Sequence, residues 1–191
     1  MSDGEREFPD EPAGPFPTPP REAVDDERRT IRYRAVGTDL GRETAGSTLV
    51  DMYRAFDPAD RAQGIPPSTE PAIADWLDAI LTDDARNVVA FADATDAAVG
   101  HATLVPDGEV YELAIFVLQA YQGAGVGTEL LRTALGHGAA TGVDRVWLTV
   151  ERWNGPAVAL YRKTGFETDE AGSFELEMCL RLAPSQTEST G

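Results

Sequence analysis

Apolar side chains recur along most of the chain with two different spacings. Strict alternation with polar residues is typical of a half-buried strand, and a short apolar run bounded by turn residues is typical of a buried one. The predicted strands are 30–36, 87–92, 98–105, 110–118 and 145–150, followed by a hairpin of 166–168 and 174–182. The strand at 110–118 is nine residues long and mostly apolar, so we expect it to be central in the sheet.

Four other segments repeat their apolar residues every three to four positions, as an amphipathic helix does. Three stripes define the first three helices: Leu49, Met52, Tyr53 and Phe56; Ile73, Trp76, Leu77, Ile80 and Leu81; and Val126, Leu130, Leu131, Ala134 and Leu135. We expect the second helix to begin near Ser68, a good N-cap, and the third to end near Gly136 or Gly138. The fourth helix is predicted over 156–164, with Gly165 as its C-cap.

The two ends of the chain differ in composition from the part between them. Residues 1–28 hold six prolines and three arginines against nine acidic residues, a net charge of −6, and are expected to be disordered. Residues 183–191 are small and polar and are expected to be flexible. A chain of 191 residues has room for one ordinary domain, which we place at 29–182.

The charge of the chain is strongly negative, at −17, and of its 16 basic residues only Lys163 is a lysine. Such a surface suits a high-salt cytoplasm, where a Debye length of about 3 Å at 1 M salt screens repulsion between carboxylates. An ordinary acidic protein is the alternative. In either case clustered cations are lacking, which argues against a nucleic-acid surface.

Other classes of protein are disfavoured by what the sequence lacks. No apolar run approaches the length of a membrane helix, and the N-terminus lacks a secretory pattern, so we expect a cytoplasmic protein without membrane contact. Cys179 is the only cysteine of the chain, so no internal disulfide framework is expected. Because His101 and His137 are the only histidines, a Cys/His metal site is not expected either. We expect both histidines to be structural.

Residues 122–128 read Gln-Gly-Ala-Gly-Val-Gly-Thr and connect a predicted strand to a predicted helix. Backbone amides at such a turn, together with the positive end of the helix dipole, suit a phosphate group. The same glycines are equally compatible with a packing role. A P-loop would require a Gly-Lys-Ser or Gly-Lys-Thr ending, and a dinucleotide loop would open a βαβ series, so neither of these classes fits.

Two motifs resemble the GCN5-related N-acetyltransferase (GNAT) family. Gln122, Gly125 and Gly127 match the family's acetyl-CoA pyrophosphate loop, Gln/Arg-x-x-Gly-x-Gly/Ala. Downstream, Asn154, Ala157, Leu160-Tyr161, Lys163 and Gly165-Phe166 match Asn-x-x-Ala-x-x-Leu-Tyr-x-Lys-x-Gly-Phe. The resemblance covers roughly residues 31–182. It implies an α/β fold of the α+β type: a mixed, mostly antiparallel sheet of six to seven strands, with helices on both faces and splayed fourth and fifth strands at 110–118 and 145–150.

The resemblance implies direct transfer of an acetyl group from acetyl-CoA, as co-substrate, to a primary amine. The acceptor would be a protein lysine, a protein N-terminus, a polyamine or another small amine; homodimers are common in the family, and these residues leave that question open. By matching position, the cofactor-binding residues are Ile115, Phe116, Val117, Gln122, Gly123, Ala124, Gly125, Val126, Gly127, Thr128 and Asn154. The alternatives are a non-catalytic acetyl-CoA sensor or scaffold, and a purely structural protein.

Two residues are implied to carry the chemistry. Tyr161 matches the family's usual acid, and its phenol, with a pKa of about 10, can donate a proton to the leaving thiolate. Glu112 lies where family members often carry a base for the amine. Tyr161 could instead serve only in packing, and Glu112 could point to solvent or pair with an arginine. The sequence departs from the family at Gly123-Ala124, where many members carry Arg or Lys, so anion binding would depend on backbone amides.

Overall fold

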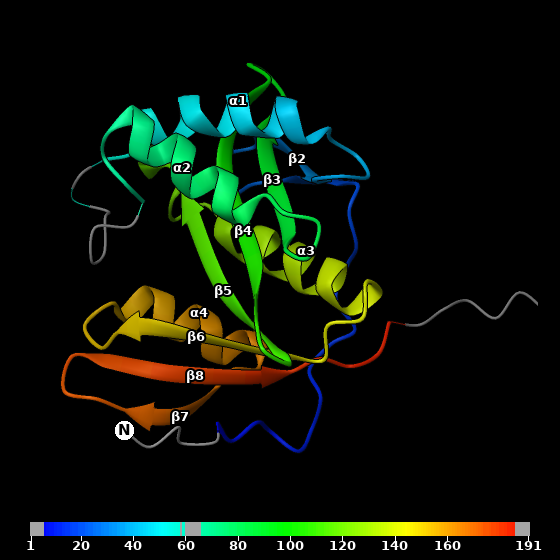
Figure 1. Cartoon of the computed structure of the whole chain (residues 1–191), viewed down its shortest axis with the longest axis vertical. Helices are drawn as coiled ribbons and strands as arrows, with labels where there is room; N and C mark the ends of the chain where they lie inside the picture. Colours follow the sequence, from blue (N-terminus) through cyan, green and yellow to red (C-terminus); the bar gives the residue numbers. More distant parts are fainter. Residues whose placement is uncertain (1–5, 58, 60–65, 186–191) are drawn as a thin grey trace, which may run out of the picture.

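Eight strands form one sheet in the order β1-β2-β3-β4-β5-β6-β8-β7 in this computed structural model, which describes residues 6–57, 59 and 66–185 (Figure 1). The strands are β1 Arg21–Val24, β2 Thr30–Ala35, β3 Arg86–Ala92, β4 Ala97–Asp107, β5 Val110–Val117, β6 Arg145–Glu151, β7 Glu167–Ala171 and β8 Glu175–Arg181. Neighbouring strands are antiparallel except β5 and β6, which are parallel. The mixed α/β fold is confirmed, with eight strands rather than six or seven.

Four helices cover the two faces of this sheet, as the apolar stripes predict. They are α1 Arg42–Arg54, α2 Glu70–Ile80, α3 Val126–Ala140 and α4 Gly155–Thr164. We call the side covered by α1 and α2 the front face, where Leu49, Tyr53 and Leu77 pack on Val89 and Phe91. On the opposite, back face lie α3 and α4 (Figure 1). Among the described helices, none has the length and apolar character needed to span a membrane.

The parallel strands β5 and β6 are paired at only two positions, Tyr111 with Val146 and Glu112 with Trp147. Beyond that point β5 stays paired with β4, and β6 with β8, so the two halves of the sheet diverge (Figure 1). The predicted splay of these two strands is therefore confirmed. They are the fifth and sixth strands because β1 precedes the first strand that the sequence predicted.

The first segment of the chain is ordered where the structure describes it, which corrects the expectation of disorder over 1–28. Residues 6–29, which we call the N-terminal strap, cross the body of the protein. The Ala13 amide donates to the Arg181 carbonyl (2.8 Å), the Ala183 amide donates to the Ala13 carbonyl (2.9 Å), and 21–24 add β1 to the edge of β2. A segment too polar to form a core of its own is thus ordered by backbone bonds to the folded domain. Residues 1–5 and 186–191 of the two predicted tails lie outside the described residues.

The third helix does not end where the sequence predicts, and the strap explains the glycine at 136. The helix continues through Gly136 and Gly138 to Ala140. A Cβ at Gly136 would lie 2.0 Å from the Pro17 carbonyl oxygen, because the strap crosses the helix there. Glycine thus permits a close approach instead of ending the helix. At the start of α2 the correction is smaller: Thr69, not Ser68, is the N-cap. Gly165 is confirmed as the C-cap of α4, with φ of 117°.

A buried chain of hydrogen bonds ties the front helices to the sheet. The Asn87 side-chain amide donates to the Ile80 carbonyl (2.9 Å), so the Asn87 oxygen is left to accept from Nε2 of His101 (2.8 Å). Nδ1 of His101 then accepts from the Tyr53 hydroxyl (2.7 Å). Burial lowers the pKa of His101 to about 3, so the ring is neutral at physiological pH. His101 therefore has the structural role that the sequence suggested.

Replacing Gly136 with Ala should displace the strap from α3. The clash with the Pro17 carbonyl should cost about 1–3 kcal/mol of the free energy of unfolding, in the range of other overpacked sites. Gly46→Ala in α1 is the matched control, because its Cβ would meet only Leu81 Cδ1 at 4.0 Å, and it should be neutral or stabilising by up to about 1 kcal/mol. Urea unfolding of both variants measures the difference. Equal stabilities would show that the strap does not contact α3 in this way.

His101 should make the protein lose stability in acid. The unfolded chain binds a proton on this ring below pH 6.5, whereas the folded protein binds it only near pH 3. The contribution of the neutral His101 ring to the free energy of unfolding is complete above pH 6.5. It falls by about 1.4 kcal/mol for each pH unit below that value. Urea unfolding at pH 7.5, 6.0 and 5.0 should show a smaller loss for His101→Gln than for the wild type. Identical pH dependence in the two proteins would contradict a neutral buried ring.

Candidate functional site

The opening between β5 and β6 contains the first group of predicted site residues. Ile115, Phe116 and Val117 follow the last β5–β6 pair, so their backbone groups bond β4 on one side and face the opening on the other. Phe116 points to the front face, where it packs edge-on against Tyr53 and Trp76. A strand edge left open in this way can bind an extended ligand through main-chain hydrogen bonds.

The glycine-rich loop is joined to β5 by a short 3-10 turn, Gln119–Tyr121, and leads into α3. Gly123 and Gly125 have φ of 71° and 88°, a backbone region that favours glycine, and Gly125 is the N-cap of the helix. The first amide to bond inside the turn of the helix is that of Glu129, which donates to the Gly125 carbonyl (3.1 Å). The amides of 126–128 therefore point out of the helix N-terminus. This arrangement suits an anion.

Gln122 connects this loop to the end of β5. Its side-chain amide donates to the Val117 carbonyl (2.9 Å), so the two predicted cofactor-binding segments are held together. The sequence indicated that both residues belong to the site but not that one binds the other. The bond spans five residues, and no local periodicity signals it.

The strap braces the same loop from outside, through residues that sequence reasoning missed. The Arg29 guanidinium donates to the Ala120 carbonyl (2.9 Å) and stacks on the Tyr121 ring at 4.1 Å. The Asp26 amide donates to the Ala124 carbonyl (2.9 Å). Arg29 is itself held by the buried carboxylate of Asp25 (2.7 Å). Asp25 and Asp26 fall in the stretch expected to be disordered and Arg29 directly follows it, so no sequence signal pointed to these contacts.

The fourth helix contributes two predicted residues on the far side of the opening. Asn154 caps α4, since its side-chain oxygen accepts from the Ala157 amide (3.3 Å). Tyr161 lies in the same helix with only 9% of its surface exposed, and its ring contacts that of Phe166. Burial raises the pKa of Tyr161 to about 12, so the phenol stays protonated at neutral pH. The side chain is therefore packed in the back-face core with its hydroxyl protonated.

Glu112 lies at the point where β5 and β6 separate, opposite Trp147. Its neighbour Leu113 packs in the back-face cluster that contains Tyr161. Because successive side chains in a strand point to opposite faces, Glu112 projects to the front face. Partial desolvation and the nearby carboxylate of Asp107 raise its pKa above the ordinary value, while Arg6 acts in the opposite direction. Glu112 thus lies at the separation of the strands on the front face, and Tyr161 lies on the back face.

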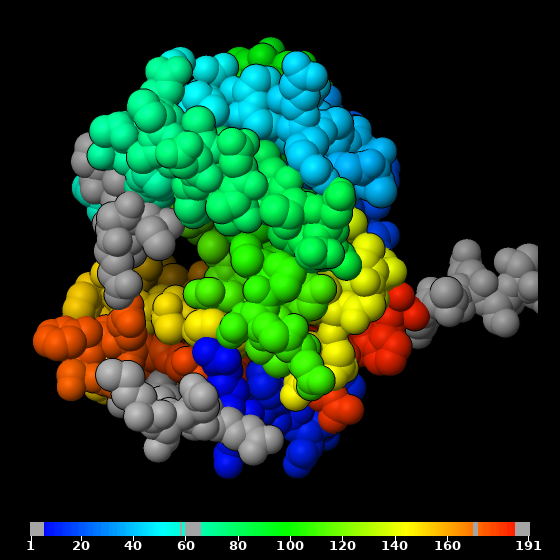
Figure 2. Space-filling view, viewed as in Figure 1, coloured from blue at the N-terminus to red at the C-terminus, as the bar shows by residue number. Residues whose placement is uncertain are grey.

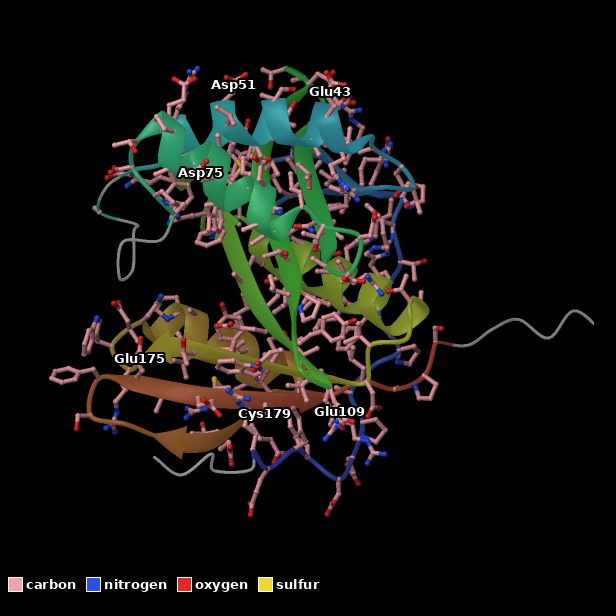
Figure 3. All side chains as sticks on the ribbon, viewed as in Figure 1. Glu43, Asp51, Asp75, Glu109, Glu175 and Cys179 are labelled. Carbon is pink, nitrogen blue, oxygen red and sulfur yellow. The ribbon has the colours of Figure 1, made fainter. Side chains whose placement is uncertain are left out.

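Three potential metal ligands lie together on β7 and β8: Asp169, Glu177 and Cys179 have ligand atoms within 4.8 Å of one another. Figure 3 shows Cys179 on β8. Burial, together with the two carboxylates, raises the pKa of the Cys179 thiol to about 12, and Arg6 already binds Glu177 (2.9 Å). The group is therefore arranged as a carboxylate–guanidinium cluster around a protonated thiol.

A separate hollow of about 900 Å³ lies between α1 and α2. Leu77 and Leu81 line it, together with acidic residues that include Glu43 and Asp78. Glu43 lies on α1, at the end of the molecule far from β6 and β8 (Figure 3). This hollow contains none of the residues that the motifs identify, so the β5–β6 opening remains the candidate site.

Known proteins resemble this chain in sequence and in fold. The model of the Acetyltransferase (GNAT) family matches residues 49–166. An uncharacterized N-acetyltransferase of Mycobacterium tuberculosis (strain ATCC 25618 / H37Rv) is 32% identical over 122 residues, which cover 58% of this chain and 78% of that relative. The GNAT domain of S. lividans PAT superposes with a TM-score of 0.71 at 16% identity, covering 85% of this chain and 96% of its own. The PaiA N-acetyltransferase of Thermoplasma acidophilum, solved with coenzyme A, superposes with a TM-score of 0.61 at 19% identity. The superposition covers 79% of this chain and 98% of that protein.

Replacing Gly125 with Ala should weaken acetyl-CoA binding. A side chain in the left-handed region costs about 1–2 kcal/mol, which corresponds to roughly tenfold in affinity if the loop relaxes to avoid it. Gly127→Ala is the matched control, because its Cβ would make only an ordinary contact of 3.7 Å with Val117 and the motif accepts alanine there. Calorimetric titration with acetyl-CoA compares the two. Equal acetyl-CoA affinities of the two variants would show that binding does not depend on the left-handed backbone at Gly125.

Proposed function

Because the chain belongs to the GNAT family of acetyltransferases, acyltransferases that depend on acetyl-CoA, we propose that it transfers the acetyl group directly to a primary amine. One observation carries the proposal: β5 and β6 separate after two paired positions, and the glycine-rich start of α3 lies directly beyond the open edge of β5. The opening offers main-chain groups for an extended arm, and the helix N-terminus offers amides for a phosphate group.

The cofactor would be held mainly by backbone groups. In the proposal, residues 115–117 bond the pantetheine arm as an added strand would, residues 122–128 bind the pyrophosphate, and Asn154 contacts the arm. The loop itself has neither lysine nor arginine. Amides at the helix N-terminus and the helix dipole supply the positive potential there. The bonds of Gln122 and Arg29 support this role because they fix the loop before the ligand arrives.

The proposed reaction requires two proton transfers. The acceptor ammonium loses a proton to Glu112, directly or through water, and the free amine attacks the thioester carbon. A backbone amide near Val117 would stabilise the oxyanion, an effect worth about 3 kcal/mol in other enzymes. The carbon–sulfur bond then breaks, and Tyr161 donates its proton to the leaving thiolate. The positions of Glu112 and Tyr161 on opposite faces of the opening favour this division of roles.

Three features stay predictions: which primary amine is the acceptor, whether the protein forms a homodimer, and whether it is adapted to high salt. The rival function is a sensor that binds acetyl-CoA without transferring it. Calorimetry with acetyl-CoA, together with a thiol-release assay over a panel of primary amines at low and high salt, distinguishes the two. Release with at least one amine supports the proposal, binding without release supports the sensor, and absence of binding contradicts both.

Substitutions of the two proposed proton carriers should separate catalysis from binding. Tyr161→Phe and Glu112→Gln should each lower kcat by about 10²-fold or more while acetyl-CoA affinity is retained. Since the pKa of Glu112 is raised, the acid limb of the wild-type kcat/KM profile should lie above pH 4.5 and should be lost in Glu112→Gln.

Tyr33→Phe and Glu109→Gln are matched controls that change the same groups elsewhere. Tyr33 is buried in β2, and Glu109 is an exposed residue in the turn before β5 (Figure 3). Both should keep wild-type kcat. Wild-type turnover in Tyr161→Phe or Glu112→Gln would remove that residue from the mechanism.

A further inference from the structure

Arg6, near the start of the strap, binds where β5 and β6 part. We call its binding site, formed by Trp147, Glu177 and Asp107, the seat. Its guanidinium carbon lies 3.6 Å from the centre of the Trp147 ring. Nε donates to Glu177 (2.9 Å) and Nη1 donates to Asp107 (3.2 Å). A flat cation is thus stacked on an indole and held at its edge by two carboxylates, an arrangement that combines cation–π attraction with charge-assisted hydrogen bonds.

This seat is on the same face of the sheet as Glu112. Trp147 is the strand partner of Glu112 in the last β5–β6 pair, and Val146 and Leu148 on either side of it pack in the back-face cluster. Trp147 therefore points to the front face, as do Cys179 opposite it and Glu177 next along that face of β8. Figure 2 shows the blue start of the strap against yellow and green atoms in the lower part of the molecule.

The seat carries more negative charge than Arg6 neutralises. Asp107 and Glu177 both bind Arg6, and both carboxylates also act on Glu112, where Arg6 is the one cation named among the described residues. The indole Nε1 of Trp147 is also buried without a hydrogen-bond partner among the described residues. The surplus of carboxylates favours a cationic group, and the indole N–H is left as a donor for an acceptor atom of a ligand.

We propose that this seat is the acceptor's cation site: a guanidinium or second ammonium group binds between Trp147 and Glu177 in place of Arg6, while the acceptor's primary amine reaches Glu112. The substrate class is therefore an amine that carries a second cationic group. The start of the strap is an internal competitor that occupies the seat until such an acceptor displaces it. This inference rests on the proposed function, and it assigns Trp147, Glu177 and Asp107 to acceptor recognition and not to proton transfer.

Agmatine, which has a primary amine at one end and a guanidinium at the other, is the probe for this site. Quenching of tryptophan fluorescence and calorimetry, at one fixed ionic strength, give its dissociation constant with the full chain. Arg6→Ala should bind agmatine about tenfold more tightly than the wild type, because the competitor is gone. Arg6→Lys should stay close to the wild type, because an ammonium can still occupy the seat. Butylamine, with a single charge, should show no difference among the three proteins.

A second set of variants tests the seat itself. In the Arg6→Ala background, Glu177→Gln should weaken agmatine binding about tenfold, whereas Glu175→Gln in the same strand should leave it unchanged. A short peptide with an N-terminal alanine followed by arginine, run in parallel, distinguishes a peptide source of the two charges from a small amine. Thermal unfolding and acetyl-CoA affinity of each variant show that the fold is retained.

The outcomes separate this inference from the proposed function. Equal agmatine affinity in the wild type and Arg6→Ala would contradict the proposal that the seat binds the acceptor's second cation. Equal losses of affinity in Glu177→Gln and Glu175→Gln would also contradict it. If thiol release with other amines continued in that case, the acetyltransferase proposal would stand without it. Loss of acetyl-CoA binding by the wild type would instead remove the proposed function on which the inference depends.

Discussion

The short parallel pairing of β5 and β6 is the constraint on which the rest of the site depends. Two residue pairs hold the strands together, and each strand then follows its antiparallel partner, β4 or β8. A fully paired sheet would leave no main-chain groups for a ligand at this position. Because the separation begins at Glu112 and Trp147, the proposed base and the seat of Arg6 both lie where the strands part.

The strap contacts this opening at both of its ends. Arg6 occupies the seat on Trp147, while Asp26 and Arg29 hold the glycine-rich loop. Between these points the strap is fixed by β1, by its bonds on either side of Leu182 and by its passage over Gly136. A segment with little apolar surface of its own therefore links the glycine-rich loop to the seat of Arg6.

Electrostatics in this protein depends on where the few cations lie. The chain carries −17 overall, and most of its arginines pair with carboxylates on the surface, where such pairs contribute little to stability. Arg6 and Arg29 differ because each also stacks on an aromatic ring beside the candidate site. In contrast, the polar chain of Tyr53, His101 and Asn87 is neutral and fully buried, and it fixes the front helices without adding charge.

The sequence alone determined the order and type of most elements, the positions of both motifs and the splay of the two central strands. The elements and motifs follow from spacings of a few residues, since alternation, helical stripes and short motifs are local properties of the chain. The splay was implied only by the family resemblance that the motifs carry. Only the tertiary structure decided the course of the strap, the extra strand β1, the continuation of α3 through Gly136 and the seat of Arg6. Each depends on residues more than a hundred positions apart, such as Pro17 with Gly136 or Arg6 with Trp147, or on a strand pairing that the strap's composition argued against. Contacts of this kind arise from the shape of the folded surface, which no local pattern encodes.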